Sequence, residues 1–317
     1  MWTYHPDLLA TPVPRYTSFP TAAEFGDIAA HHVEAALDGV GAGTPVSLYL
    51  HIPYCHEICW YCGCNTGAAN RTGRVAAYLE RLIGEIRLLA RRLGGRGRVG
   101  RIAFGGGSPN ALTPAQFAAL LGEVRAAFDC ADAIVSVELD PRRFEPGWDE
   151  ALASAGVTRA SLGVQTFSPA LQRAIGRIQP VEMIADVAAR LRATGVNSIN
   201  FDLMYGLPGQ DTRLLLDTID TALDMQPDRL AVFGYAHVPH LIPRQRRIDA
   251  DALPGSEARF RQAEAAHQRL VEAGWRPIGF DHFAQAGDPL ALAARAGTLR
   301  RNFQGFTDDP LSTSAGS

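Results

Sequence analysis

Strand-like and helix-like segments alternate along the chain, and this alternation limits the possible folds more than any other feature of the sequence. Short apolar runs are followed by longer segments in which apolar residues recur every three or four positions. Repeated β-α units of this kind predict a parallel sheet covered by helices, either doubly wound or curled into a barrel. The predicted strands are 46–53, 100–107, 133–140, 159–167, 198–207, 229–238 and a seventh at 275–284, and the predicted helices include 74–93, 113–128, 181–195 and 212–225.

Several predicted strands alternate between apolar and polar residues, although a parallel strand that is buried on both faces should be apolar throughout. Glu138, Gln165 and Asp202 each lie on the polar face of their strand, opposite Val, Leu or Phe. An ordinary eight-stranded barrel fills its lumen with branched apolar side chains. We therefore expect an open, polar lumen, with the apolar strand faces turned outward under the helices. A partly solvated sheet face is the alternative.

The composition limits the classes of function. At 317 residues, 47% of them hydrophobic, the chain can form one α/β barrel or two small domains around a real core. All thirty basic residues are Arg, which excludes Schiff-base lysines and a lysine-dependent P-loop. The net charge of −3 gives no general attraction to nucleic acid. The sequence shows no signal-peptide pattern and no run of ~18 apolar residues, so we expect a cytoplasmic protein without a membrane span.

Four of the five cysteines lie in one short segment, HIPYCHEICWYCGC (51–64). The C-x3-C-x2-C spacing lets Cys55, Cys59 and Cys62 surround one compact centre, whereas Cys64 would be strained as a further ligand. Three ligands and an open fourth position are typical of a reactive site rather than a closed structural one. Zinc with a bound water and a four-iron cluster with one unligated iron both fit this description, and the spacing favours the cluster.

These cysteines and a series of further motifs resemble one known family. C-x3-C-x2-C after a first strand is the signature of the radical S-adenosylmethionine (SAM) superfamily. From about Pro14 to Phe306 the chain is similar to the oxygen-independent coproporphyrinogen III oxidases. This resemblance implies an α/β fold, a partial (β/α)6 TIM-like barrel of the radical SAM type, with a [4Fe-4S] cluster and two bound SAM molecules. The motifs that carry it are PRYTSFPTA, LYLHIPYCHEICWYCGCN, FGGGSP, VELDP, LGVQTF, NFDLMYGLPGQ, FGYAHVP and RRNFQG.

The resemblance also implies roles for individual residues. Cys55, Cys59 and Cys62 would bind three irons and leave the fourth for SAM. The glycine run 105–107 and the residue after it would offer backbone N–H groups to a ligand carboxylate, as an anion-binding nest. The residues expected to contact the first SAM are Tyr49, Gly106 and Glu138, and those expected to contact the second are Tyr61, Gly107, Ser108, Gln165, Arg177, Asp202 and Ala236.

The reaction that the resemblance implies is oxidative decarboxylation of two propionates of coproporphyrinogen III to vinyl groups, which gives protoporphyrinogen IX in haem biosynthesis. A 5′-deoxyadenosyl radical made from SAM would start it. The expected partners are the tetrapyrrole, an electron donor and an electron acceptor, and we expect a monomer. As catalytic residues we expect His51 as a proton donor or relay, Cys64 as a group that tunes the site, and Arg15 as a carboxylate-binding residue of a closing N-terminal segment.

Two alternative functions remain from the sequence, a radical SAM haem chaperone and a non-catalytic cluster-binding protein. The chaperone is expected to lack both the fourth cysteine and PRYTSFP, which this chain has.

We divide the chain into an N-terminal segment (1–45), a barrel core (46–306) and a short polar tail (307–317). The family pattern continues into a helical C-terminal domain that the tail does not resemble. We therefore expect cluster assembly with weakened or absent decarboxylation.

Overall fold

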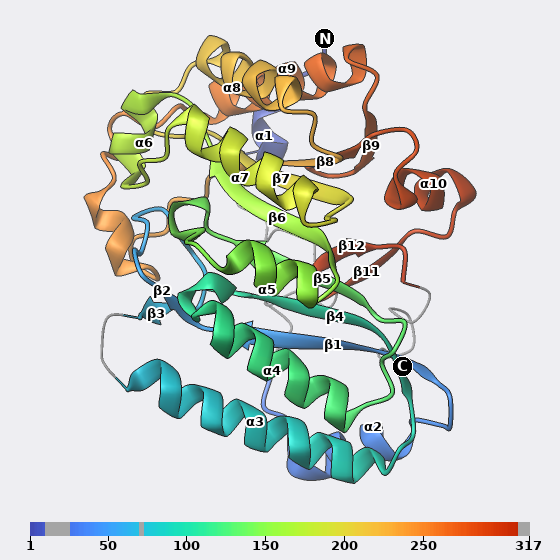
Figure 1. Cartoon of the computed structure of the whole chain (residues 1–317). Helices are drawn as coiled ribbons and strands as arrows, with labels where there is room; N and C mark the ends of the chain where they lie inside the picture. The colour runs from blue at the N-terminus through green and yellow to red at the C-terminus, as the bar shows by residue number, and fades with distance from the viewer. Residues whose placement is uncertain (10–25, 70–72, 310–317) are drawn as a thin grey trace.

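Six parallel strands form the centre of the fold in this computed structural model, which describes residues 1–9, 26–69 and 73–309 (Figure 1). The strands stand in the sheet in chain order, and each neighbouring pair is parallel. Each β-α unit therefore places its next strand beside the last one. The strands are β1 (Pro45–Ile52), β4 (Arg98–Gly106), β5 (Ile134–Leu139), β6 (Val157–Gln165), β7 (Ser198–Tyr205) and β8 (Arg229–Gly234).

Helices make the connections between the parallel strands and cover the sheet (Figure 1). None of the helices in the described ranges is both long and apolar enough to cross a membrane. The connecting helices are α3 (Arg74–Leu93), α4 (Pro114–Ala127), α5 (Trp148–Ser154), α6 (Pro169–Ile175), α7 (Val181–Ala193), α8 (Thr212–Asp224) and α9 (Ser256–Glu272). The shorter elements include α1 (Pro6–Leu9), α2 (Ala30–Asp38), α10 (Pro289–Ala296) and the 3-10 helices η2 (Pro109–Ala111), η3 (Pro141–Arg143) and η4 (Pro243–Arg247).

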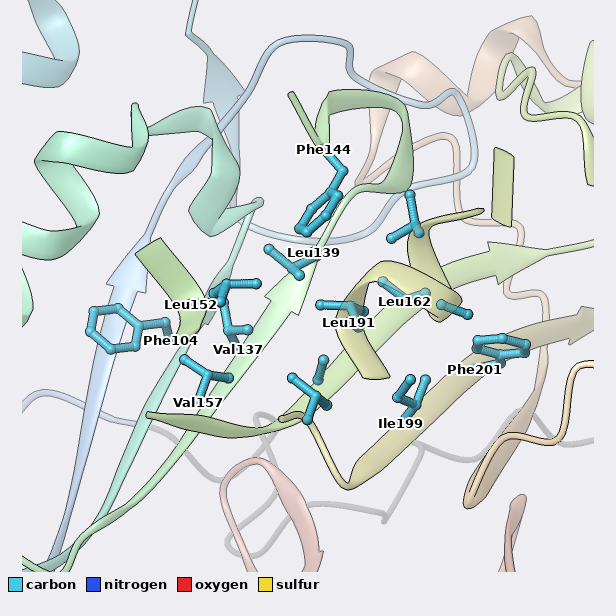
Figure 2. Packing of buried hydrophobic residues seen from close by; sticks show 14 of the residues in the cluster. Phe104, Val137, Leu139, Phe144, Leu152, Val157, Leu162, Leu191, Ile199 and Phe201 are labelled. Carbon is cyan, nitrogen blue, oxygen red and sulfur yellow. The ribbon is translucent and has the colours of Figure 1, made fainter. Parts of the chain in front are cut away.

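The apolar faces of the strands pack under the helices, as their alternation predicts. Val137 and Leu139 of β5 and Leu162 of β6 are buried in one core cluster with Leu152 of α5 and Leu191 of α7 (Figure 2). The polar residues on the opposite faces of the same strands line cavities instead. The division into an outward apolar face and an inward polar face is therefore confirmed.

The seventh predicted strand, 275–284, is wrong as a single element. The segment is an antiparallel hairpin of β9 (Arg276–Gly279) and β10 (His282–Ala284), and β10 pairs antiparallel with β8. The chain reverses at Phe280, whose φ of 47° lies in the left-handed region. A strand cannot continue through that conformation, so the sheet ends in two short antiparallel strands.

A second hairpin, β11 (Arg300–Asn302) and β12 (Gly305–Thr307), connects the two sides of the sheet. Phe303 at its tip lies 4.9 Å from the ring of Tyr49 on β1, whereas Phe306 lies 5.3 Å from the ring of His282 on β10. Asp308, directly after the hairpin, pairs with arginines of β4 and β6. The hairpin therefore bridges β1, at one edge of the open sheet, and β10, which lies next to the other edge.

Candidate functional site

One cavity of about 420 Å³ lies where the parallel strands β4 to β8 end. Ligands of parallel α/β sheets bind at this end, because the loops that follow the strands converge there. Tyr49 and His51 lie beside the cavity, and Arg15 lies outside the described residues. The remaining predicted site residues all line it, namely Cys55, Cys59, Tyr61, Cys62, Cys64, Gly106, Gly107, Ser108, Glu138, Gln165, Arg177, Asp202 and Ala236.

The loop with the four cysteines is closed at its base by a short parallel strand pair, β2 (Tyr54–Cys55) and β3 (Gly67–Ala68). Within the loop, the Trp60 N–H donates to the Ile175 carbonyl at 3.1 Å. The chain beyond α6 can come this close because Gly176 has no side chain, since a Cβ there would lie 2.6 Å from the Trp60 ring. The bond from Trp60 and the absence of a side chain at Gly176 therefore hold the loop against the end of α6.

Each of the three predicted ligand sulfurs accepts a hydrogen bond. The Thr66 hydroxyl donates to Cys55 Sγ at 3.3 Å, Arg177 donates to Cys59 Sγ at 3.3 Å, and the Cys64 N–H donates to Cys62 Sγ at 3.4 Å. Donors directed at a sulfur favour the thiolate, which is the form that binds metal. These bonds also tune a bound cluster through its sulfurs.

The pKa values of the thiols reflect the same contacts. Hydrogen bonding to Cys64 lowers the pKa of Cys62 against the effect of burial, and the guanidinium groups of Arg244 and Arg177 act in the same direction. Burial raises the pKa of Cys55, and the hydrogen bond from Thr66 opposes that rise. The thiol of Cys62 is therefore more readily ionised for binding than that of Cys55.

The donor set fits an iron–sulfur cluster. All four thiols of the loop are free, and all four line the cavity. Within the described ranges, no three His, Cys, Asp or Glu side chains surround the position of one metal ion. A cluster does not require such a position, because each thiolate binds a different iron. Cys55, Cys59 and Cys62 would hold the cluster, and exposed Cys64 would support Cys62 through its N–H group.

A buried ion-pair network lies behind the cysteine loop. Arg177, only 6% exposed, donates to Asp140 at 3.2 Å and to the Gly163 carbonyl at 2.7 Å, besides its bond to Cys59. Arg142 donates to the same carboxylate at 2.6 Å. Burial alone would raise the pKa of Asp140, but Arg177 and Arg142 outweigh it and hold that pKa below its ordinary value. The network fixes the ends of β5 and β6 against the loop.

Two carboxylates face the centre of the cavity. Burial, and then the negative charge of Asp202, raise the pKa of Glu138 to about 7, although the Gly106 N–H donates to Glu138 at 3.3 Å and opposes the shift. Asp202 accepts hydrogen bonds from Ser161 at 3.2 Å and from Asn200 at 2.9 Å. Glu138 is open to water in the cavity, so the hydroxyl groups of a ligand could replace the water that contacts its carboxyl group.

The glycine run at the end of β4 does not form the predicted anion nest. The Gly107 N–H donates to the Ile52 carbonyl and the Ser108 N–H to the Tyr54 carbonyl, each at 2.8 Å, so neither is directed at a ligand. The glycines instead permit close approach. Gly106 has a φ of 113°, and a Cβ there would lie 2.7 Å from the ring of His51.

Gln165, at the end of β6, is held in an uncommon backbone conformation. Its φ is 67°, in the left-handed region that non-glycine residues rarely adopt, and the pairing of β6 with β7 shifts register at this point. Such conformations persist where the surrounding structure enforces them, and they concentrate at functional sites. The side chain is buried and lines the cavity.

Tyr49 and His51 form a hydrogen-bonded pair between β1 and the glycine run. The Tyr49 hydroxyl lies 3.1 Å from His51 Nδ1, and His51 Nε2 lies 3.4 Å from the Asn65 carbonyl. Because a carbonyl only accepts, Nε2 carries the proton in this arrangement and Nδ1 accepts from Tyr49. Burial, and then the charge of Glu138, raise the pKa of the Tyr49 phenol above its ordinary value.

Several residues that position the site have no signal in the sequence. Thr66, Arg142 and Gln245 belong to no motif that indicates their contacts. Gln245 in η4 donates to the carbonyls of Tyr61 and Ala236, at 2.9 and 3.1 Å, and so joins two predicted site residues. Two of their contacts join segments that are far apart in the sequence, the bond from Gln245 to Tyr61 and a bond from Arg142 to Cys59 Sγ at 3.4 Å.

Comparisons with known proteins agree with this geometry. The family model described as the Radical SAM superfamily matches residues 49–222. An oxygen-independent coproporphyrinogen III oxidase of Bradyrhizobium diazoefficiens is 48% identical over 299 residues, which are 94% of this chain and 66% of that protein. One from Cereibacter sphaeroides is 42% identical over 96% of this chain and 68% of its own length. This chain belongs to that family.

A solved structure of another coproporphyrinogen III oxidase has the same fold as this chain. The Escherichia coli coproporphyrinogen III oxidase, described as a radical SAM enzyme, matches with a TM-score of 0.89 and 37% identity over 97% of this chain and 70% of that one. The prediction of a partial radical SAM barrel is therefore confirmed. Membership in the superfamily implies a [4Fe-4S] cluster and SAM as cofactors. The chain spans about two thirds of the length of the curated relatives that it matches.

Proposed function

We propose that the protein is an oxygen-independent coproporphyrinogen III oxidase, which converts two propionates of coproporphyrinogen III to vinyl groups and forms protoporphyrinogen IX. Each conversion releases CO2 and removes one hydrogen atom and one electron from the side chain. The observation that carries the proposal is the placement of three hydrogen-bonded thiols and an acidic lumen around one cavity, in a chain of this family. When bound, the cluster and SAM supply the one-electron chemistry that starts the reaction.

Cys55, Cys59 and Cys62 would hold the cluster at the mouth of the lumen. Arg177 is central to that role, because its guanidinium contacts both Cys59 and Asp140. A buried cation beside the thiolates offsets part of their negative charge. It also fixes Cys59 relative to the ends of the strands, where the ligand would lie.

Residues of the lumen would bind and orient the ligand. With a pKa of about 7, Glu138 exchanges its proton near neutral pH and can either donate to or accept from a ligand hydroxyl. Asp202 and Gln165 line the same cavity, from β7 and β6. The roles of these residues toward one or two SAM molecules stay predictions of the family resemblance.

Tyr49 and His51 are the residues best placed to hold a proton beside the cysteine loop. His51 accepts at Nδ1 from the Tyr49 hydroxyl and donates at Nε2 to the Asn65 carbonyl, so both ring nitrogens have fixed partners. We therefore infer that His51 relays a proton rather than merely filling space. The predicted role of Arg15 concerns a residue outside the described ranges.

We further propose that the enzyme works in the cytoplasm, because free thiols that bind a cluster suit a reducing compartment. Its partners would be the tetrapyrrole, an electron donor and an electron acceptor. We expect the chain to act as a monomer.

Anaerobic turnover tests this function. The reconstituted full chain is incubated with SAM, dithionite and coproporphyrinogen III, and protoporphyrin and 5′-deoxyadenosine are quantified after oxidation of the product. C55S is expected to form neither compound. C130S should behave as the wild type, because Cys130 is buried in the apolar core away from the cavity. If 5′-deoxyadenosine forms without protoporphyrin, the cofactor site stands and the proposed oxidase activity fails, which is the absent decarboxylation that the family resemblance led us to expect.

A further inference from the structure

Serine and arginine alternate around the lumen in the first half of the six parallel strands. In the sheet, Arg159 of β6 pairs with Ser136 of β5 on one side and with Ser198 of β7 on the other. Guanidinium groups only donate hydrogen bonds, and hydroxyl groups can donate as well. The amino-terminal end of the lumen is therefore rich in donors. The six residues line a cavity of about 240 Å³ and are Ser47 (β1), Arg101 (β4), Ser136 (β5), Arg159 (β6), Ser198 (β7) and Arg229 (β8).

This space, which we call the amino-terminal cavity, is continuous with the reaction cavity. Glu138 and Ser161 line both, so the two cavities are the two ends of one lumen that meet at these residues. The amino-terminal cavity is smaller than the ~300–1,000 Å³ sites that drug-sized ligands occupy. Its size therefore suits a small ion with water rather than a tetrapyrrole.

The aspartates that pair with the three arginines stand behind them and do not face this cavity. Asp308 lies 2.9 Å from Arg101 and 3.5 Å from Arg159, and Asp288 lies 2.8 Å from the arginine of β8. Among the described residues that line the amino-terminal cavity, Glu138 is the one carboxylic acid. A ligand in the cavity would therefore meet three cations and one acid with a raised pKa.

These ion pairs leave part of the positive charge unmatched. Among the described residues, the buried Nη2 atom of Arg229 has no hydrogen-bond partner. Burial, and then the charge of Arg229, lower the pKa of Arg159, and the charge of Arg101 acts in the same direction against the attraction of Asp308. A buried donor without an acceptor costs free energy, and a bound anion would supply the acceptor.

A propionate of the tetrapyrrole is a weaker candidate for this cavity. Coming from the reaction cavity, it would have to pass the carboxyl groups of Glu138 and Asp202, and a negative charge there repels an anion. Gln304 of the β11–β12 hairpin lines the amino-terminal cavity and is exposed. A small solute can therefore enter beside the hairpin without crossing the reaction cavity.

We propose that the amino-terminal cavity binds a small oxyanion, phosphate or bicarbonate, at the guanidinium groups of Arg159 and Arg229. Guanidinium groups bind such oxygens through paired N–H donors, and the neighbouring serine hydroxyls can donate to the remaining oxygens. The inference goes beyond the proposed function, because this binding requires neither a cluster nor SAM. Phosphate would come from solution, whereas bicarbonate would form from the CO2 that the proposed reaction releases.

Titration calorimetry of the reconstituted full chain with inorganic phosphate, and separately with bicarbonate, tests the proposal. R159Q should bind the anion about tenfold more weakly, since a hydrogen bond to a charged group accounts for a change of this size. Asp308 keeps Arg101 as its partner in R159Q, so the variant should fold. R190Q is the matched control and should bind as the wild type does, because Arg190 pairs with Asp149 outside the lumen.

S198D supplies a second variant that removes no ion pair. It places a carboxylate beside Arg159 in the sheet and should abolish anion binding, while circular dichroism and urea unfolding show a native fold. Loss of binding in S198D with full binding in R190Q supports the proposal, and the anion that binds the wild type more tightly identifies the source. Absent binding of both anions to the wild type overturns it, as does full binding in S198D or an equal loss in R190Q.

Competition with the substrate completes the test. Phosphate bound to the wild type should stay bound when coproporphyrinogen III is added anaerobically, and its displacement would overturn the assignment of the cavity to a free ion. Failure of the proposed function shows separately, as absent turnover with dithionite and SAM, and leaves the binding measurements unaffected.

Discussion

Replacing Arg177 by Met tests whether the buried network behind the cysteine loop stabilises the protein. Methionine keeps an apolar stem but removes the cation that pairs with Asp140. Breaking a buried ion pair by removing one partner typically costs about 3–5 kcal/mol. We expect a loss at the lower end of this range, because in R177M Arg142 still pairs with Asp140 and Gln179 still donates to the Gly163 carbonyl. We therefore expect R177M to lower the free energy of unfolding by about 3 kcal/mol.

Urea unfolding of the full chain measures this difference. R173M is the matched control, because Arg173 is exposed in the last turn of α6, and it should change the free energy of unfolding by less than about 0.5 kcal/mol. The depressed pKa of Asp140 means that the pair stabilises the fold above the ordinary carboxyl pKa and loses this effect as pH falls. The gap between R177M and the wild type should therefore narrow below about pH 4. Equal stability of R177M and R173M at neutral pH would refute the reasoning.

Three further predictions concern the cavity. G106A should cost about 1–3 kcal/mol of unfolding free energy in urea, because its backbone is left-handed and crowded, whereas G122A in α4, where nothing lies within 4 Å, should not destabilise. The raised pKa of Glu138 means that wild-type stability falls as pH rises from about 4.5 to about 7. E138Q should reduce this fall by about 1 kcal/mol, a value kept small because water reaches the carboxyl group, and an unchanged pH dependence in E138Q would contradict the assignment. Q245A should lower the free energy of unfolding by about 1–3 kcal/mol and speed amide hydrogen exchange near Tyr61, because Gln245 donates to the Tyr61 carbonyl. Unaltered exchange near Tyr61 would contradict a stabilising link between η4 and the cysteine loop.

The alternation of apolar and polar residues correctly predicted which face of each strand packs in the core and which faces the lumen. The period of two in β5 follows from strand geometry, so Val137 could be assigned to the core and Glu138 to the lumen without knowledge of their neighbours. The spacing of the cysteines likewise predicted that one loop would carry the ligands of one centre. Both predictions depend on residues that are close together in the sequence.

Contacts between distant segments could not be predicted in this way. Arg177 reaches Cys59 across 118 positions of sequence, and only the family resemblance pointed to it. The anion nest failed because Gly107 donates to the carbonyl of Ile52, at the end of β1, which the sequence around the glycines does not indicate. The hairpin at 275–284 escaped prediction because its turn depends on Phe280, a residue type that rarely marks a turn.

The composition of the metal centre tests the account most directly. We would reconstitute the full chain anaerobically and measure iron, sulfide and the electron paramagnetic resonance spectrum of the reduced protein. We predict about four irons and four sulfides for each chain, lost in C55S, C59S and C62S but retained in C64S and C130S. A single bound metal ion, or a cluster that survives C59S and disappears in C64S, would contradict the account.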